Sequence, residues 1–379
     1  MKTSIWLAIL SFAALFTLTQ CVEPFELPAS AIDANILVVE GSLNIEKGTG
    51  KVVLSRSQKL EDQGEPIRET RAKVTIETDA NESFSMYDVG GGAYRVTGMS
   101  FSYGKQYRLR VKTANGEEYV SEFVSTQKTP EIDDITWRAE QNGIQISVSS
   151  HDPANNTLYY RWEFEETYEY TSYYNSLWAY KGGEVIPRSQ EEQFYKCWRT
   201  DPSTSILVGS TAHLVQDVVR DYPLVFREGV SEKLATKYSI LVRQYGISKA
   251  EYEYWQMLKK NTESVGSIFD AQPSQVRGNI KNVKQPDNPV LGYFSIQSMT
   301  EKRMFISGPE MRKLGFSYHD IPVCSLDTTS LRDLPQWLAI DKLIVEELLP
   351  PNAGYVVANR ACADCRVKGG STIKPEYWK

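Results

Sequence analysis

Four cysteines in the body of the chain could do chemistry, and two of them form a Cys-x-x-Cys pair: Cys197, Cys324, Cys362 and Cys365. Zinc would require a second ligand pair at similar spacing, but Cys197 and Cys324 are isolated in the sequence. A redox pair usually opens a helix after a strand, whereas this pair precedes two glycines. An even number of cysteines in an exported chain favours disulfides. We therefore expect structural disulfides and no metal; three pairings remain open, and zinc or redox chemistry is the alternative.

The fifth cysteine, Cys21, follows a basic start at Lys2 and an apolar segment over residues 5–16. This layout is typical of a secretory signal peptide, and the apolar segment is too short to span a bilayer. The motif LTQC resembles a bacterial lipobox, although Gln20 departs from the small residue usual there. We predict a signal peptide over residues 1–20 and a lipidated tether over residues 21–34, with fatty chains on Cys21 holding the protein at a membrane. The alternative is a plain signal peptide that leaves Cys21 as a free thiol.

Aromatic residues are concentrated in the stretch LYYRWEFEETYEYTSYYNSLWAY. On a strand over residues 159–170, aromatic side chains fall on one face and charged side chains on the other. The first hypothesis is a ligand platform, and the alternative is a strand whose aromatic face covers a core while its charged face meets water. The looser residues that follow are the tentative ligand-binding set, because exposed aromatics in a loop are costly unless they contact something. They are Tyr173, Tyr174, Trp178 and Tyr180.

Residue patterns that support catalysis are scarce. The sequence has neither the Gly-x-Ser-x-Gly motif of serine hydrolases nor His-Glu-x-x-His, and its three histidines are scattered. Glu163, Glu165, Glu166 and Glu169 could include a glycosidase pair, but neighbouring residues on a strand satisfy the required spacing trivially. We therefore expect no enzymatic activity and no cofactor. The formal net charge of −6 gives no reason to expect a nucleic-acid partner.

The elements that would position these residues are mainly strands. From residue 36 to about 125, short stretches rich in Val, Ile, Thr and Tyr alternate in polarity between turn residues, which predicts an immunoglobulin-like or carboxypeptidase-regulatory-like β-sandwich over residues 35–126. Residues 127–379 are predicted to form a second β-rich domain with a helical insertion at about 247–275. Ser248 and Glu251 are spaced as a capping box at the start of that helix.

Several ordered motifs together resemble a known family: LVVEG, YYRWEFEETYEY, YKCWRT, GSIFDAQPSQVRGNIKN and the terminal CADCRVKGGSTIKPEYW. They are similar to the Bacteroidota lipoproteins grouped as domain-of-unknown-function family 4249. The resemblance covers Cys21 to Trp378. It implies an outer-membrane lipoprotein, lipid-anchored and displayed on the cell surface, often encoded beside a SusC-type TonB-dependent transporter.

From this resemblance we expect a non-enzymatic partner of such a transporter that captures a nutrient, for example a peptide, a glycan or a chelated metal. The alternative function is a structural or assembly lipoprotein that makes protein–protein contacts in an envelope complex. The resemblance supplies no catalytic residues.

Overall fold

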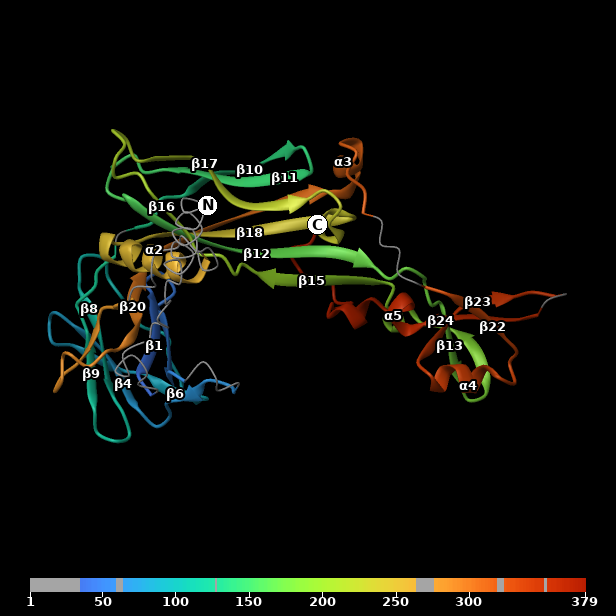
Figure 1. Cartoon of the computed structure of the whole chain (residues 1–379), viewed down its shortest axis with the longest axis horizontal. Helices are drawn as coiled ribbons and strands as arrows, with labels where there is room; N and C mark the ends of the chain where they lie inside the picture. The colour runs from blue at the N-terminus through green and yellow to red at the C-terminus, as the bar shows by residue number, and fades with distance from the viewer. Residues whose placement is uncertain (1–34, 59–63, 127, 264–275, 319–323, 351–352) are drawn as a thin grey trace, which may run out of the picture.

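The computed structural model describes residues 35–58, 64–126, 128–263, 276–318, 324–350 and 353–379. As predicted, the fold is mainly β. Two β-sandwiches lie at one end of an elongated molecule, and a small third unit, the distal lobe, lies at the other end (Figure 1). Cys21 and the predicted tether fall outside the described residues.

The first sandwich consists of two sheets that face each other across one apolar core. Its first sheet has the order β20 (Leu291–Gln297), β1 (Leu37–Asn44), β2 (Thr49–Arg56), β7 (Ala93–Val96) and β6 (Tyr87–Gly90), with β3 (Ile67–Arg68) on β2. Its second sheet has the order β19 (Ile280–Asn282), β9 (Glu118–Ser121), β8 (Tyr107–Lys112), β4 (Lys73–Thr78) and β5 (Ser83–Ser85).

Alternation in sequence explains this sandwich. In β1 the side chains of Leu37, Val39 and Leu43 are buried in the core, while those of Glu40 and Ser42 point to the outer face of the sheet. Between β8 and β9, Gly116 adopts a φ of 85°, a conformation that glycine reaches without a Cβ clash. The sequence therefore defines both the core and the turns of this unit.

The predicted domain boundary requires one correction, because the first sandwich is completed by strands from late in the chain. β20 pairs in parallel with β1, placing Leu291 opposite Val38, and β19 pairs with β9. The prediction assigned residues 127–379 to a second domain. Residues 280–297 instead belong to the first sandwich, since they supply Phe294 and Ile296 to its core.

The second sandwich packs a three-stranded sheet against a larger one. The smaller sheet has the order β10 (Ile132–Glu140), β11 (Gly143–His151) and β17 (Val218–Glu228). The larger has the order β15 (Lys196–Pro202), β12 (Tyr159–Thr171), β18 (Lys237–Gly246) and β21 (Met299–Ser307), with β16 (Leu207–Ser210) also on β12. Short helices flank these strands: η2 (Gln190–Glu192), η3 (Glu232–Leu234) and α3 (Gly308–Lys313).

The aromatic face of β12 lies in the core of the second sandwich. Tyr160, Trp162 and Phe164 are all buried against strands of both sheets. This confirms the core interpretation of these residues rather than the ligand platform. The opposite face was expected to meet water, and that expectation is wrong at both ends of the strand. Arg161 is covered at one end and Glu169 at the other, where the indole of Trp378 donates a hydrogen bond to its carboxylate at 3.1 Å.

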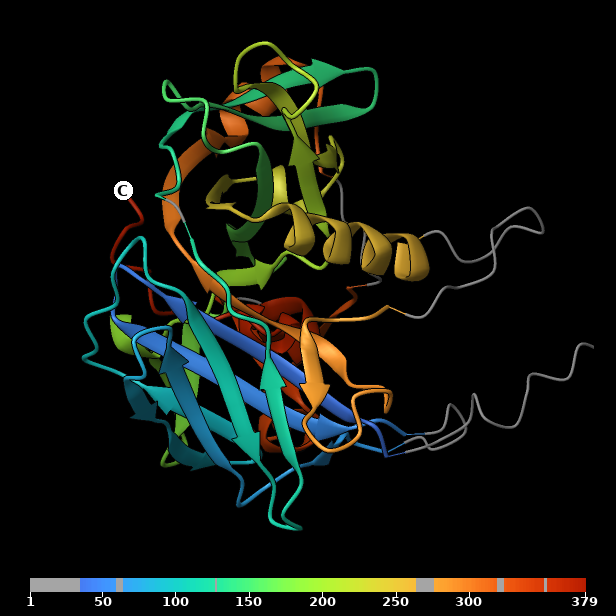
Figure 2. The same ribbon diagram turned by 90° about the vertical axis from the view of Figure 1, so that its left-hand side faces the viewer.

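Helix α2 (Lys249–Glu263) lies between the two sandwiches (Figure 2). It falls within the predicted insertion at 247–275, of which residues 264–275 are outside the described part. The hydroxyl of Ser248 accepts a hydrogen bond from the backbone N–H of Glu251 at 3.1 Å, as the capping pattern predicts. The side chain of Glu251, however, is buried and bonds to the indole of Trp255.

The distal lobe is a hairpin and a small sheet with short helices. The hairpin pairs β13 (Trp178–Lys181) with β14 (Glu184–Pro187), and the sheet has the order β22 (Leu326–Thr329), β24 (Gly354–Asn359) and β23 (Lys342–Leu348). The helices are α4 (Leu334–Ala339), α5 (Arg360–Ala363) and η4 (Cys365–Lys368). Within the described ranges of the chain, no helix has the length and apolarity needed to cross a bilayer.

Candidate functional site

The four aromatic residues predicted to bind a ligand lie in the distal lobe and in the segment that leads into it. Trp178 and Tyr180 pack against its small core, and the Tyr174 hydroxyl donates a hydrogen bond to the carbonyl of Cys324 at 3.1 Å. Tyr173 is the one exposed member of the set, and its ring meets that of Tyr174 edge-on. Three of these side chains therefore have structural contacts.

The four cysteines form two disulfides, which confirms the expectation of structural cross-links. Cys197 pairs with Cys365, and Cys324 pairs with Cys362. The two members of the Cys-x-x-Cys pair thus bond to different distant partners. Neither is a free thiol, so the pair cannot bind zinc or act as a redox dithiol. Among the described residues, no group of three or more His, Cys, Asp or Glu side chains is placed to hold a metal ion.

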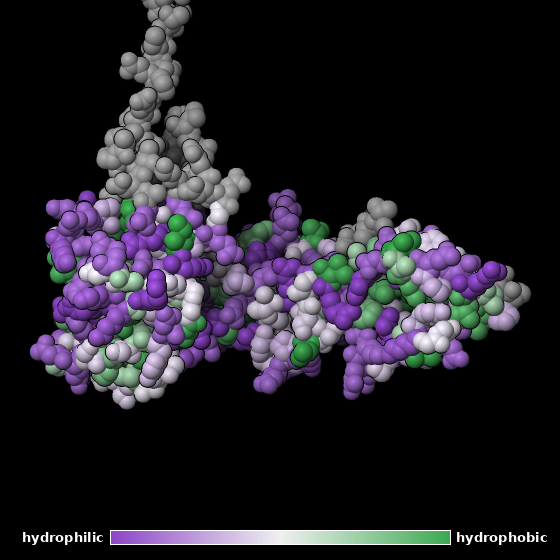
Figure 3. Space-filling view, turned by 90° about the horizontal axis from the view of Figure 1, so that it is seen from below, coloured by the Kyte–Doolittle hydropathy of each residue, from purple (hydrophilic) through white to green (hydrophobic). Residues whose placement is uncertain are grey.

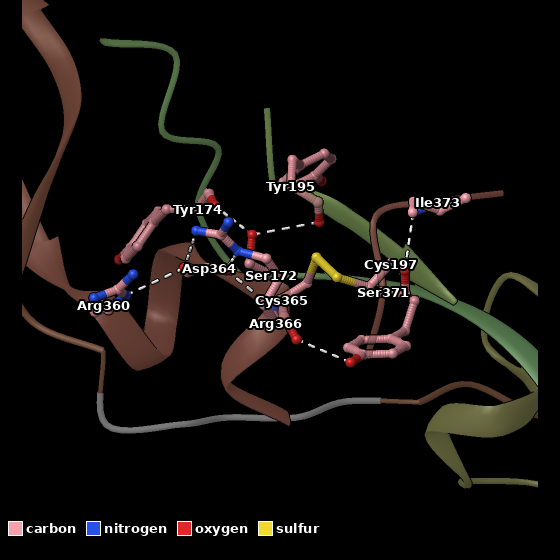
Figure 4. Close-up of a disulfide and its surroundings, with 11 residues drawn as sticks. Ser172, Tyr174, Tyr195, Cys197, Arg360, Asp364, Cys365, Arg366, Ser371 and Ile373 are labelled. Atoms are coloured by element: carbon pink, nitrogen blue, oxygen red, sulfur yellow. Dashed lines mark hydrogen bonds and ion pairs between the residues drawn. A yellow bond between two sulfur atoms is a disulfide. The ribbon is translucent and has the colours of Figure 1, made fainter. Parts of the chain in front are cut away.

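The surroundings of the Cys197–Cys365 bond are also structural (Figure 4). Asp364 is buried, and its carboxylate accepts hydrogen bonds from Arg366 at 2.8 Å and from Arg360 at 3.2 Å. Burial alone would raise the pKa of Asp364, but the hydrogen bonds from these arginines hold it below the usual value. The carboxylate therefore stays ionised and fixes the turn that carries Cys365.

A larger hollow lies where the two sandwiches meet α2, and we call it the cleft. Its volume is about 900 Å³, at the upper end of the range usual for ligand sites. One wall is the outer face of β1, β2 and β20; the other walls are β12, β18 and α2. The cleft thus lies at an interface between domains, where ligand sites occur preferentially.

Arg161, from β12, is a charged group buried in the wall of this cleft. Only 7% of its surface is exposed, and its guanidinium lies over the rings of Tyr245 at 4.4 Å and Trp255 at 4.9 Å. Its Nη1 forms an ion pair with Glu163. Its Nε is buried and has no hydrogen-bond partner in the described part of the chain. This unpaired donor is closed off from the cleft by its neighbours, so any contact of Arg161 with a ligand would come from the rest of the guanidinium.

Glu163 is held by its neighbours. In addition to the ion pair with Arg161, it accepts a hydrogen bond from the Tyr245 hydroxyl at 3.0 Å. Burial acts to raise the pKa of Glu163, but the charge and hydrogen bond of Arg161 lower it overall. Glu163 is therefore an ionised carboxylate already engaged by two partners.

Glu251, on α2, is the second deeply buried charged residue of the cleft, with 5% of its surface exposed. Its carboxyl accepts a long hydrogen bond from the Trp255 indole at 3.3 Å, and the side chain of Gln297 is a second hydrogen-bond partner. Burial raises the pKa of Glu251, and the charge of Arg161 offsets this only in part. The cleft therefore favours a neutral carboxyl that can donate as well as accept a hydrogen bond.

Aromatic side chains complete the cleft. The ring of Tyr254 on α2 lies 4.8 Å from that of Tyr293 on β20, so the helix packs on the first sandwich at this point. Burial raises the pKa of Tyr293 to about 12, which keeps its hydroxyl protonated. Tyr252 packs in the same way on Tyr159 of the second sandwich, with ring centroids 5.1 Å apart. The helix thus contacts both sandwiches.

A hydrogen-bonded joint fixes the two sandwiches beside the cleft. Ser298, between β20 and β21, donates to Glu46 of the first sandwich at 2.6 Å and accepts from the backbone N–H of Thr129 at 2.8 Å. The hydroxyl of Thr129 in turn accepts from the backbone N–H of Gly246 at 2.9 Å. Because these groups are buried or partly buried, the joint holds the walls of the cleft in a defined geometry.

Sequence reasoning missed the cleft because each of its residues had a simpler interpretation. Arg161 was placed on the solvated face of a strand, and Glu251 was placed in a capping box. One local signal was present: Glu251 and Trp255 are four residues apart, so they share a face of α2. The approach of that face to Arg161 depends on tertiary packing.

Comparisons with known proteins identify the family of the chain. The model of the family described as "Domain of unknown function (DUF4249)" matches residues 22–303. No curated protein matches. Among solved structures, a two-domain fibronectin type-III segment from chicken tenascin aligns with 56% of this chain and 90% of its own length, at 10% identity and a TM-score of 0.17. That score is too low to carry an argument.

Proposed function

The chain belongs to the DUF4249 family, and from this premise we propose that it is a non-enzymatic outer-membrane lipoprotein that captures a small ligand for a SusC-type TonB-dependent transporter. The observation that carries the proposal is the cleft of about 900 Å³, which is lined by charged and aromatic side chains from both sandwiches and α2, among them Arg161, Glu251 and Tyr293. Ligand sites are typically concave, with apolar and aromatic walls and a few convergent polar groups, and the lining of this cleft has that composition.

A tether on Cys21 fits this function. Fatty chains on that thiol would hold the protein at the membrane, and residues 22–34 would separate the first sandwich from the lipid. The cleft would then lie near the mouth of a membrane transporter. Because the joint at Ser298 fixes the cleft, ligand binding would need little ordering of the protein, which favours affinity.

The arrangement of Glu163 supports a binding role over catalysis. A general base needs a free lone pair directed at a substrate proton. In this cleft Glu163 is an ionised partner of Arg161 and accepts a hydrogen bond from Tyr245, so it is better placed to hold the wall of the cleft than to take a substrate proton.

The alternative function, a structural or assembly lipoprotein, has one observation in its favour. Apolar side chains are exposed on the distal lobe, whose surface is seen from below in Figure 3. Leu326, Ile340 and Leu349 are 48%, 64% and 76% exposed. Exposed apolar surface of this kind can mark a protein contact.

One experiment separates the two functions. The natively lipidated protein would be recovered from outer membranes with a tag, and the co-purifying proteins identified by mass spectrometry, with Cys21→Ala as the control. We expect one TonB-dependent barrel in stoichiometric amount, reduced in the control. Recovery of assembly proteins without a barrel would favour the alternative function, and recovery of neither would contradict the transporter partnership.

A further inference from the structure

The walls of the cleft identify the kind of ligand it accepts. β1 is paired on both edges, by β2 and β20, and β12 and β18 are likewise paired on both edges. Their backbone N–H and C=O groups are therefore occupied in the sheets. At the outer edge of β20, the side-chain amide of Asn279 bonds both the N–H and the C=O of Phe294, at 2.9 and 2.8 Å. A peptide that binds by adding a strand would find the edges of β1, β12 and β18 filled, and would have to displace Asn279 to pair with Phe294 of β20.

Recognition in the cleft must therefore come from side chains, and these are of two kinds. Hydrogen-bonding groups project from both walls, among them Arg161, Glu251, Ser42 and Gln297. Aromatic groups, including Tyr254 and Tyr293, lie beside them. A ligand that matches this wall has many hydroxyl groups, because a hydroxyl can both donate to and accept from the polar side chains. It also has apolar C–H faces, which can pack on the aromatic rings.

The charge of the cleft is balanced. Arg161 is paired with Glu163, Glu251 is favoured as the neutral acid, and Lys51 and Glu40 on the opposite wall have opposite signs. A ligand with a strong net charge would lose its hydration in the cleft without gaining an opposite charge there, and that loss is costly. The balance favours an uncharged ligand.

From these observations we infer that the cleft binds a neutral oligosaccharide, whose hydroxyl groups bond Arg161 and Glu251 and whose ring faces pack on Tyr254 and Tyr293. This inference rests on the proposed function and specifies its ligand. A cavity of about 900 Å³ is large enough for several linked sugar rings.

The test is isothermal titration of the mature chain, as Cys21→Ser, with a panel of neutral tetrasaccharides and a panel of uncharged and cationic tetrapeptides. We expect at least one tetrasaccharide to bind. Tyr254→Ala should weaken that binding about tenfold, the loss typical of removing a ring contact. Tyr173→Ala removes an exposed tyrosine outside the cleft and should leave binding unchanged.

Glu251→Gln distinguishes the ligand classes. Glutamine keeps the shape of the neutral acid together with a donor and an acceptor, so saccharide binding should stay within about threefold of the parent value. A cationic ligand would instead lose its counter-charge and bind at least tenfold more weakly.

The outcomes separate this inference from the proposed function. Binding of a tetrapeptide but no saccharide, weakened by Tyr254→Ala, would overturn the saccharide inference and leave the binding function standing. Saccharide binding that is unaffected by Tyr254→Ala but lost in Tyr173→Ala would overturn the location of the site. If neither panel binds and the membrane recovery yields no barrel, both the inference and the proposed function fail.

Discussion

Aromatic residues lie at both ends of strand β12, but their surroundings differ. At its start, Arg161 and Glu163 lie beside the rings of Tyr245 and Trp255, and buried polar capacity remains unfilled. Beyond its end, Tyr174 and Trp178 are fixed by the distal lobe and its disulfides. Aromatic density in sequence therefore does not locate a binding site. What distinguishes the first region is a hollow lined by charged and aromatic side chains, because unsatisfied buried donors also occur near the far end, at Arg188 and Trp198.

The largest effect should come from cutting the cross-link at the far end of β12. Replacing both Cys197 and Cys365 with serine removes a bond between residues 168 positions apart in the sequence. Since a disulfide restricts the unfolded chain more when it closes a longer loop, we expect the free energy of unfolding to fall by about 4 kcal/mol. Denaturant titration measures the loss.

The same variant tests whether the disulfide at one end of β12 affects the cleft at the other end. At a temperature where the variant is folded, ligand affinity at the cleft should be unchanged, because the bond lies at the opposite end of the strand. A loss of affinity in the folded variant would show that the distal lobe shapes the cleft.

The second effect concerns the middle of the strand, where Glu166 is buried. Its carboxylate accepts hydrogen bonds from Arg227 at 2.6 Å, Lys233 at 2.8 Å and Tyr238 at 2.8 Å. Glu166→Gln leaves Arg227 without its counter-charge, while Lys233 keeps Asp201 at 3.0 Å, and we expect a loss of about 3 kcal/mol in the free energy of unfolding at pH 7. Thermal or denaturant unfolding measures it, with the exposed Glu228→Gln as the control.

The hydrogen-bonded network around Glu166 should also make the free energy of unfolding depend on pH. Burial acts to raise the pKa of Glu166, but hydrogen bonds from Arg227 and Lys233 lower it overall. A carboxyl whose folded pKa is depressed contributes stability above its unfolded pKa, roughly 4.3, and loses it as the pH falls through the folded value. The parent protein should therefore lose stability more steeply than Glu166→Gln as the pH falls from about 5 to 3. Equal slopes would contradict the ionised network.

The third effect compares an aromatic residue of the cleft with one of the distal lobe. Tyr254→Ala should reduce ligand affinity about tenfold, or about 1.4 kcal/mol, while Trp178→Ala should reduce stability without changing affinity. Titration and unfolding of both variants test this. The reverse pattern would restore the distal aromatics as the binding site.

The smallest effect is expected at Glu251. Burial raises the pKa of this carboxyl, so the folded protein holds the proton more tightly than the unfolded chain does. A raised folded pKa means that stability decreases as the pH rises above the unfolded value of roughly 4.3. Glu251→Gln should therefore be slightly more stable than the parent at pH 8 and equal to it below pH 4. Lower stability of the variant at pH 8 would mean that Glu251 is ionised in the cleft.

Local patterns were sufficient to predict much of the fold. Alternation predicted the strands of the first sandwich, Ser248 predicted the start of α2, and the even cysteine count predicted disulfides. Each of these features depends on neighbours in sequence or on a simple count.

The remaining features depend on contacts between distant segments. No periodicity indicates that Leu291 pairs with Val38, or which of three cysteine pairings forms. The burial of Arg161 likewise requires α2 to fold across a strand face that reads as solvated in sequence. The candidate site was missed for this reason, since it is built entirely at a junction between domains.

The most direct test of the cleft as the binding site is native mass spectrometry of the protein purified from the cells that produce it. We predict a small-molecule adduct on the parent chain and on Tyr173→Ala, and its loss from Tyr254→Ala. An adduct retained by Tyr254→Ala and lost from Tyr173→Ala would contradict the account and place the ligand at the distal end of β12.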